Sequence, residues 1–374
     1  IAKALSYFQS SSKLFDGIED IDFPEIRGEM EDDFGSSDEQ GKNYPPLIIV
    51  ELGINHNGKI DLAIDMVDHA ISAGAEIIKH QTHVVNDEMS VEAKKIIPGN
   101  SRQNIYNIIE NTALNEKDEK KLMNYIKSRK KIFISTPFSR AAADRLGKFN
   151  IPVYKIGSGE CNNHYLVDYI CKFKKPIIMS TGMNSIQSIA KSVNIIRKHK
   201  LPYALMHCTN IYPTPNNLVR LDCLSEIKRA YPDAILGLSD HTSSIYACLG
   251  AVSLGARILE KHFVDNKLKR KGPDVSASMD TKELKQLIEG SKKIFDSRGG
   301  KKSPIKEEAK TIAFAFQSVV STKDILVGEK LTLDNIFLRR PGNGDFTVKD
   351  FKNLLGKKVK RKVKKNHQIK LTDI

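Results

Sequence analysis

The sequence predicts an α/β fold, a (β/α)8 TIM barrel followed by a small β-rich domain. Eight short apolar runs alternate with eight segments of helical periodicity over about 250 residues, which is the pattern of a parallel barrel. Polar residues follow all eight runs. After residue 313, short β-like runs and tight turns replace this pattern. We therefore expect an extension at residues 1–45, the barrel at 46–300, a linker at 301–312 and the small domain at 313–374.

The extension is predicted from its composition. Acidic side chains crowd residues 16–39, and the segment shows no periodic apolar pattern before Pro45 and Pro46. A segment with many charges and few apolar residues buries too little surface to fold by itself. We expect a solvated or loosely packed segment and assign it no chemistry.

The barrel strands are predicted from short apolar runs and the helices from apolar residues that recur every three or four positions. The strands are residues 47–50, 77–78, 132–134, 153–156, 176–179, 203–206, 234–236 and 258–259. The helices are residues 60–73, 116–128, 139–148, 165–173, 186–198, 221–230, 243–254 and 281–295. An open doubly wound sheet shows the same alternation, but its polar residues gather at one switch point. Polar residues after all eight strands favour the closed barrel.

The small domain is predicted from β-like runs at residues 318–320 and 335–338 and from the turn at 341–344. A domain of about 60 residues has a marginal core. We expect it to dock on the barrel of its own chain or of a partner.

Composition excludes several classes of protein. The chain has 374 residues, 40% hydrophobic and 28% charged, without an apolar run long enough to span a membrane and without a secretory signal pattern. Five cysteines without a CxxC pair predict neither a disulfide framework nor a zinc site, and favour a reducing, cytoplasmic location. The net charge of +14 could indicate nucleic-acid binding. However, Trp is absent and much of the excess charge lies in residues 357–370, so we predict no nucleic-acid partner.

Two histidines follow the last two predicted strands, His241 in the first case and His262 in the second. Residues at the carboxyl ends of barrel strands face the active-site mouth. Two neutral imidazoles on neighbouring strands could share one divalent ion. Each histidine could equally be a structural residue satisfied by hydrogen bonds.

Two lysines, Lys79 and Lys155, close otherwise apolar strands. A buried lysine is costly unless it meets an anion. Hydroxyl donors at the ends of the fourth, fifth and seventh predicted strands are Ser158, Ser180 and Ser239, which we expect at the same end of the barrel. These groups together predict a phosphate or carboxylate pocket. The alternative is that the lysines extend to water.

Glu51 and Glu160 are the acidic residues at strand ends, where carboxylates could move protons or orient a metal-bound water. The alternative is that both form ion pairs with the lysines. Amide and phenol groups that could bind a polyhydroxylated substrate are Gln81, Asn210 and Tyr212. His56, His83 and His207 are not assigned a role.

From about residue 47 to residue 374 the chain resembles the sialic acid synthases of the NeuB type. The matching motifs are ELGINHNG at residues 51–58, KHQT at 79–82, KIGSGE at 155–160, STGM at 180–183, GLSDHT at 237–242 and RPGNG at 340–344. The resemblance implies condensation of phosphoenolpyruvate with an N-acetylated sugar, and an antifreeze-like (SAF) C-terminal domain. The chain departs from the family in its longer acidic extension and in the basic loop 266–271.

The resemblance also implies roles for individual residues. His241 and His262 would hold a manganese ion, and Glu51 and Glu160 would be the catalytic carboxylates. The positions that bind phosphoenolpyruvate would be Lys79, Thr136, Lys155, Ser158, Ser180, Asn210 and Ser239. The positions that contact the sugar would be Gln81, Tyr212 and Asp274. Arg340 matches an arginine that one subunit inserts over the other subunit's barrel, which implies a domain-swapped homodimer.

Residues 79–83 and 97–100 resemble the N-acetylneuraminate branch, so the expected acceptor is N-acetylmannosamine. Legionaminate and pseudaminate synthases use related sugars on the same scaffold and are the alternative. Two other functions stay open: a class I aldolase in which Lys155 forms a Schiff base, and a carbohydrate-binding or ice-binding module in the C-terminal domain.

Overall fold

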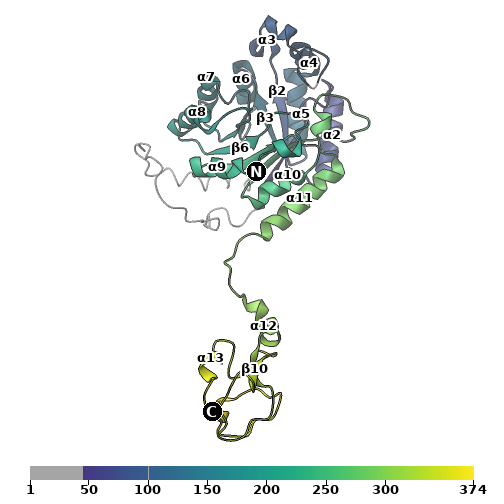
Figure 1. Ribbon diagram of the computed structural model, residues 1–374. Helices are drawn as coiled ribbons and strands as arrows, with labels where there is room; N and C mark the ends of the chain where they lie inside the picture. Colours follow the sequence, from purple (N-terminus) through teal and green to yellow (C-terminus); the bar gives the residue numbers. More distant parts are fainter. Residues whose placement is uncertain (1–44, 100) are drawn as a thin grey trace. The chain divides into compact units, whose positions relative to one another are not determined.

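A computed structural model describes residues 45–99 and 101–374, so the predicted acidic extension lies outside the described residues apart from Pro45. The chain divides into two compact units, with the boundary between Gly299 and Gly300. Each unit has its own fold (Figure 1). Within the described residues, no helix is both long enough and apolar enough to cross a membrane.

The first unit is a closed barrel of eight parallel strands, as predicted. Strand β1 pairs with both β2 and β8, which closes the sheet. The strands are β1 (Leu47–Glu51), β2 (Ile77–Thr82), β3 (Ile132–Pro137), β4 (Tyr154–Ile156), β5 (Ile177–Ser180), β6 (Tyr203–Cys208), β7 (Ile235–Asp240) and β8 (Ile258–His262).

Most strands continue further toward their carboxyl ends than the apolar runs predicted. Strand β2 includes Lys79 to Thr82, and β7 includes Gly237 to Asp240. Backbone hydrogen bonds between strands do not require apolar side chains, and the barrel supplies buried partners for the polar ones. Residues expected to follow the strands are therefore their last members.

Eight helices surround the barrel in the predicted order (Figure 1). They are α2 (Ile60–Ser72), α5 (Glu116–Ser128), α6 (Arg140–Lys148), α7 (His164–Cys171), α8 (Ile186–Lys198), α9 (Cys223–Ala230), α10 (Tyr246–Ser253) and α11 (Thr281–Asp296). Several begin at a side-chain cap, since Ser139, Ser185 and Asp280 each accept a hydrogen bond from the backbone of the first turn. Helices α9 and α10 begin later than predicted, because the residues before them form turns.

Two apolar layers hold the barrel. One fills the space between strands and helices, and includes Val50, Leu122 and Tyr203. The other fills the barrel interior below the polar strand ends, and includes Ile49 and Met206. The interior is therefore packed, and only its carboxyl end carries polar side chains suited to chemistry.

The sequence patterns did not predict the segment after β2. It contains α3 (Val85–Glu88), the 3-10 helix η2 (Val91–Lys95) and α4 (Ile105–Thr112). These elements pack around a small apolar cluster that includes Ile54, Ile108 and Ile109. The helices are too short for periodicity to distinguish them from loops.

The second unit contains α12 (Ala309–Ala315), β9 (Ser318–Ser321), β10 (Ile336–Arg339) and α13 (Phe351–Leu354). Strands β9 and β10 pair antiparallel, near the predicted positions. Its core includes Val319, Leu331, Ile336 and Ile369. The other 3-10 helices of the described residues are η3 (Asn216–Leu218) and η4 (Val275–Ala277) in the first unit, and η5 (Lys306–Glu308) and η6 (Leu371–Asp373) in the second.

Candidate active site

The candidate active site is built from side chains that point into the carboxyl end of the barrel. Lys155 on β4 contacts Glu260 on β8, although these strands are not neighbours in the sheet. Such a contact across the barrel requires both side chains to point inward. The other inward-facing members of this cluster are Glu51, Lys79, Thr136, Ser180 and Ser239.

Lys79 and Lys155 are each only 2% exposed, so the alternative that they extend to water is wrong. Lys79 forms an ion pair with Glu51, and its Nζ donates to Oγ1 of Thr136 at 3.1 Å. The predicted alternative of an ion pair therefore holds for Glu51. The amide of Gly53 donates to the same carboxylate at 2.6 Å, which fixes it at the end of β1.

Glu260 is a central residue that the sequence analysis did not select. Its Oε1 accepts from Lys155 Nζ at 3.1 Å and from Ser239 Oγ at 3.2 Å, and lies 3.8 Å from Lys79 Nζ. Lys155 also donates to Ser180 Oγ at 2.8 Å. The sequence did contain an indication that Glu260 faces the barrel interior, because it lies two positions before His262 and must face the same side of its strand.

Burial and charge shift the pKa values in this cluster. Burial lowers the pKa of Lys79 to about 7, although the carboxylate of Glu260 offsets part of the effect. Burial alone would raise the pKa of Glu260, but the charges of Lys155 and Lys79 hold it below its ordinary value. The cluster is therefore an anionic carboxylate between two lysines, of which Lys79 titrates near neutral pH.

Glu160 lies apart from the lysine pairs. Its side chain folds back over Gly157, where a Cβ atom would collide with Oε2 of Glu160. That oxygen is buried and has no hydrogen-bond partner among the described residues. Burial raises the pKa of Glu160 to about 7. A carboxyl group with this pKa can accept and donate a proton at neutral pH.

Ser158 and Asn210 meet at Gly182. The amide of Gly182 donates to Oγ of Ser158 at 3.1 Å, and a Cβ atom on this glycine would collide with Oδ1 of Asn210. Asn210 Oδ1 also accepts from Sγ of Cys208 at 3.3 Å. Glycine is required here for close packing of two polar side chains beside the lysine cluster.

The two predicted metal-binding histidines face each other. The ring centroids of His241 and His262 are 5.5 Å apart. Nδ1 of His241 lies 3.0 Å from the carbonyl of Thr209 and therefore carries a proton, which leaves Nε2 as an acceptor for Tyr212 OH at 3.0 Å. Nδ1 of His262 is buried without a hydrogen-bond partner in the described part of the chain, and lies 3.7 Å from Oδ2 of Asp274.

Burial keeps both rings neutral. It lowers the pKa of His241 to about 4 and that of His262 well below its ordinary value. Neutral imidazoles are the form that ligates metals, and an unpaired buried nitrogen suits a cation. Across residues 45–99 and 101–374, no group of three or more His, Cys, Asp or Glu is arranged to hold a metal. The candidate metal donors are thus this histidine pair.

Two of the predicted sugar-contacting residues, Tyr212 and Asp274, lie beside the histidines. Tyr212 stacks on His241 with ring centroids 4.0 Å apart. Burial raises the pKa of Asp274 to about 6. Gln81 lies further out on β2, where its Oε1 is 3.3 Å from Nε2 of His83. Arg340 belongs to the second unit, where its Nε donates to the carbonyl of Ala315 at 3.0 Å.

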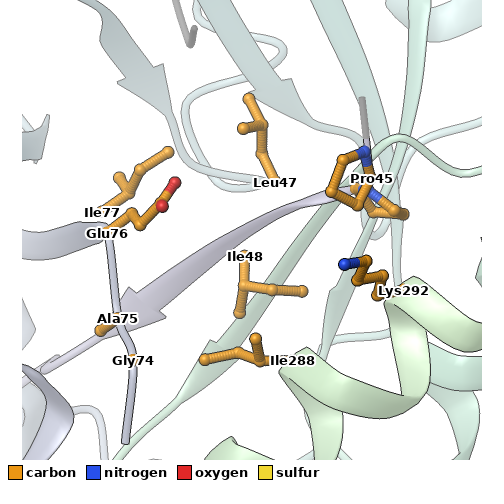
Figure 2. A pocket seen from close by; sticks show the side chains of 10 residues that line it. Pro45, Leu47, Ile48, Gly74, Ala75, Glu76, Ile77, Ile288 and Lys292 are labelled. Carbon is orange, nitrogen blue, oxygen red and sulfur yellow. The ribbon is translucent and has the colours of Figure 1, made fainter. Parts of the chain in front are cut away.

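A separate pocket lies at the amino ends of β1 and β2 (Figure 2). It is lined largely by apolar groups such as Leu47, Ile48 and Ile288, with Glu76 and Lys292 at its margin. The predicted site residues do not line it. Its position at the end of the barrel opposite the polar cluster fits a structural role.

A closed (β/α)8 barrel whose carboxyl end buries two lysines, two carboxylates and a pair of neutral histidines defines an enzyme scaffold. The chain belongs to the NeuB family: residues 66–303 match this family, and residues 316–374 match the SAF domain. The resemblance stated from the motifs is thereby confirmed, as are the barrel and the C-terminal domain.

Named relatives cover most of the chain. The N,N'-diacetyllegionaminic acid synthase of Campylobacter jejuni is 34% identical over 87% of this chain and 98% of its own. The pseudaminic acid synthase of the same species is 31% identical over 87% of this chain and 96% of its own. A crystal structure of N-acetylneuraminic acid synthetase from Leptospira borgpetersenii, in complex with citrate, is 28% identical, covers 72% of this chain and 91% of that one, and has a TM-score of 0.66.

Proposed function

We propose that the protein condenses phosphoenolpyruvate with N-acetylmannosamine and water to give N-acetylneuraminate and phosphate. The observation that carries this proposal is the adjacency of two buried lysines and their hydroxyl partners to a pair of neutral histidines, since Glu51, the partner of Lys79, lies opposite His262 in the sheet. The first group suits an anionic donor, and the second suits a metal that binds a carbonyl oxygen. Family membership supports the same chemistry.

The donor pocket is formed by cations and hydroxyl groups. Lys79 and Lys155 neutralise the phosphate and carboxylate of phosphoenolpyruvate, since both ammonium groups are already desolvated and fixed by neighbouring oxygens. The remaining donor-binding residues are Thr136, Ser158, Ser180, Asn210 and Ser239. Because Lys155 Nζ donates to both Ser180 and Glu260, this nitrogen is already engaged by two side chains, which argues against the Schiff-base aldolase.

His241 and His262 are the residues that would hold Mn²⁺. When bound, this ion supplies Lewis-acid polarisation of the aldehyde oxygen. The histidines fit the ion because His241 presents the lone pair of Nε2 once the Tyr212 hydroxyl is displaced, and Nδ1 of His262 is unpaired among the described residues. Two protein ligands leave coordination positions for substrate and water.

The carboxylates move protons during the reaction. The methylene carbon of phosphoenolpyruvate bonds to the aldehyde carbon, water adds to the adjacent cationic carbon, and phosphate leaves by cleavage of its C–O bond. The second proton of the attacking water leaves with phosphate as the keto group forms, and its first proton passes to the aldehyde oxygen. Glu160 accepts and returns this proton, because its pKa of about 7 permits both steps at neutral pH. Glu51, which is fixed by its contacts with Lys79 and the amide of Gly53, orients the water.

The acceptor sugar is bound by Gln81, Tyr212 and Asp274 on the histidine side of the pocket. We propose that Arg340 reaches the acetamido group from the partner subunit of a domain-swapped homodimer. The five cysteines, all in the described part of the chain, are free thiols, which supports a reducing cytoplasmic location.

A second candidate is a legionaminate or pseudaminate synthase with the same donor. The observation that favours it is the similarity to the two Campylobacter jejuni enzymes, at 34% and 31% identity. The donor pocket would be unchanged, and the acceptor would be a diacetamido sugar.

Product analysis separates these candidates. The protein is incubated with phosphoenolpyruvate, Mn²⁺ and either N-acetylmannosamine or diacetamido hexoses, and the products are identified by mass spectrometry and NMR. We expect a nine-carbon sugar acid and release of phosphate, both lost after chelation and restored by Mn²⁺. Full activity in a chelated, metal-free preparation would rule out the metal-dependent mechanism.

A further inference from the structure

Besides the lysine cluster, a second group of buried polar side chains lies on the helix-facing side of β2. It contains His56 from the loop after β1, His80 from β2, Glu119 from α5 and Arg145 from α6. Side chains alternate along a strand, so His80 faces α5 while Lys79 faces the barrel interior. His56, His80 and Glu119 are at most 1% exposed. Polar groups buried this deeply need partners, and here they are partners of one another.

The contacts form a continuous sequence. Nε2 of His56 lies 3.3 Å from Nε2 of His80, and Nδ1 of His80 lies 3.2 Å from Oε1 of Glu119. Nη1 of Arg145 donates to Oε2 of Glu119 at 3.1 Å. Thr82 also donates to Oε1 of Glu119. Polar contacts therefore run without a break from helix α6 to the loop after β1.

The proton positions follow from a backbone donor at one end. The amide of Gly58 donates to Nδ1 of His56 at 3.2 Å, so this neutral ring carries its proton on Nε2. Nε2 of His80 must accept that proton, and the proton of neutral His80 lies on Nδ1, facing Glu119. Burial lowers the pKa of His56 to about 3, which agrees with a neutral ring. The two rings thus hold opposite tautomers.

Charge balance favours the same arrangement. The carboxylate of Glu119 is paired with the guanidinium of Arg145. A second proton on His56 would place a charge in the protein interior without a carboxylate partner on this ring, in keeping with its lowered pKa. A cation on His80 would also turn two N–H groups toward each other at the contact between the rings.

This series of polar contacts ends at the loop after β1, which borders the proposed acceptor side of the site. In this loop Asn55 Nδ2 donates to the carbonyl of Phe263 at 2.9 Å. A Cβ atom at Gly53 would lie 2.9 Å from Nδ1 of His262 and 3.1 Å from Oδ2 of Asp274. The loop backbone therefore packs directly against both side chains, and a small shift of the loop would move them.

We propose that Arg145, Glu119, His80 and His56 form a positioning relay that holds loop 52–58 against the acceptor side of the active site. The assignment of that side rests on the proposed function, whereas the relay rests on the contacts above. Lys155, on β4, makes its hydrogen bonds to β5 and β8, and the loop reaches Lys79 only indirectly, through the hydrogen bond of Gly53 to Glu51. Loss of the relay should therefore affect the acceptor sugar more than phosphoenolpyruvate.

The tautomers are tested first, in the wild-type protein. Long-range ¹H–¹⁵N spectra of ¹⁵N-histidine-labelled protein at pH 7 should show His56 protonated at Nε2 and His80 protonated at Nδ1. This measurement needs neither substrate nor metal, so its result does not depend on the proposed function. Identical tautomers, or a doubly protonated His80, would overturn the relay.

The positioning role is tested with His80→Gln and Glu119→Gln. Hydrogen exchange of the loop 52–58 amides should become at least about 10-fold faster, while amides of strand β5 keep their rates. The KM for the acceptor should rise about 10-fold, with the KM for phosphoenolpyruvate changed less than about twofold. His199→Gln, which removes a hydrogen bond to Asp168 away from the relay, is the matched control and should change neither.

Two outcomes contradict the positioning role. One is a folded variant whose loop exchanges as slowly as in the wild type. The other is an equal rise in both KM values. If the glutamine variants do not fold, Arg145→Lys replaces them, because it keeps a cation near Glu119 while removing the guanidinium hydrogen bond.

Discussion

Lys155 and Glu260 form an ion pair across the barrel interior, with 3.1 Å between Nζ and Oε1. Removing one partner of a buried pair leaves an uncompensated charge and typically costs about 3–5 kcal/mol. We therefore expect Lys155→Met to lower the free energy of unfolding by about 3 kcal/mol. Adding Glu260→Gln should recover most of this loss.

In the double variant, catalytic activity should not recover together with stability. The double variant lacks a cation that we propose binds the donor, so its kcat/KM for phosphoenolpyruvate should stay at least about 100-fold below that of the wild type. Urea unfolding and steady-state kinetics on the wild type, the two single variants Lys155→Met and Glu260→Gln, and the double variant check both expectations. Recovery of activity in the double variant would show that Lys155 has a structural role only.

The lowered pKa of Lys79 predicts that phosphoenolpyruvate binding is coupled to uptake of a proton. With its pKa near 7, this lysine is largely neutral at pH 8 in the free protein, and a bound anion favours its charged form. Phosphoenolpyruvate binding at pH 8 should therefore take up close to one proton, and affinity should fall as pH rises above about 7. Calorimetry in buffers of different ionisation enthalpy measures the uptake.

Two variants identify the group responsible for this uptake. Lys79→Arg is charged at all accessible pH values, so it should bind phosphoenolpyruvate without proton uptake. Glu160→Gln removes the other group that titrates near pH 7 and should retain the uptake. Uptake that disappears only in the Glu160 variant would assign the linkage to that carboxyl instead.

At the scale of elements, the register of β7 and β8 fixes the distance between the two histidines. Asp240 and Lys261 are register partners on these strands, and Lys261 Nζ lies 2.7 Å from Oδ2 of Asp240. The same nitrogen donates to the carbonyl of Thr242 at 2.6 Å. Each residue of the pair directly precedes one of the histidines. The buried pair on the outer face of the barrel thus orients the imidazoles inside it.

Breaking this pair should weaken metal binding. We expect Lys261→Met to raise the Kd for Mn²⁺ about 10-fold or more, as loss of an outer-shell partner does in metal sites. Calorimetric titration of the metal-free protein measures the Kd, and circular dichroism checks folding. Lys292→Met, on helix α11, is the control. An unchanged Kd in a folded Lys261 variant would contradict this role.

At the scale of the whole molecule, the origin of Arg340 can be tested by mixing subunits. Arg340→Ala should reduce activity, since it removes the proposed contact to the acetamido group, and Lys155→Met should abolish it. If subunits exchange their C-terminal domains, a mixed dimer contains one site with both residues intact. An equal mixture should then recover up to about a quarter of wild-type activity, because half the dimers are mixed and each has one complete site.

Mixing is done by refolding or by coexpression, and activity is compared with each variant alone. Two Arg340→Ala preparations mixed together are the control. Absence of recovery despite formation of mixed dimers, detected by mass spectrometry, would place Arg340 over the barrel of its own chain or away from the site.

Sequence patterns were sufficient to predict the barrel, the order of its elements and the end of the barrel at which the candidate site residues lie. The spacing of apolar residues in a strand or helix depends on which faces of that element are buried, and this spacing can be read from the local sequence. Parallel strands bring their carboxyl ends to one face, so Lys79, Lys155 and His241 could be assigned to it before their contacts were known. Motifs then indicated the family.

The pairing of the charged groups could not be predicted and is seen only in the folded protein. Glu51 binds Lys79, whereas Lys155 meets Glu260 from a strand more than 100 residues later in the chain. Contacts at such separation arise from closure of the barrel, and no local pattern encodes them. The relay from Arg145 to His56 is of the same kind, because packing of helices against strands, rather than sequence spacing, brings its members together.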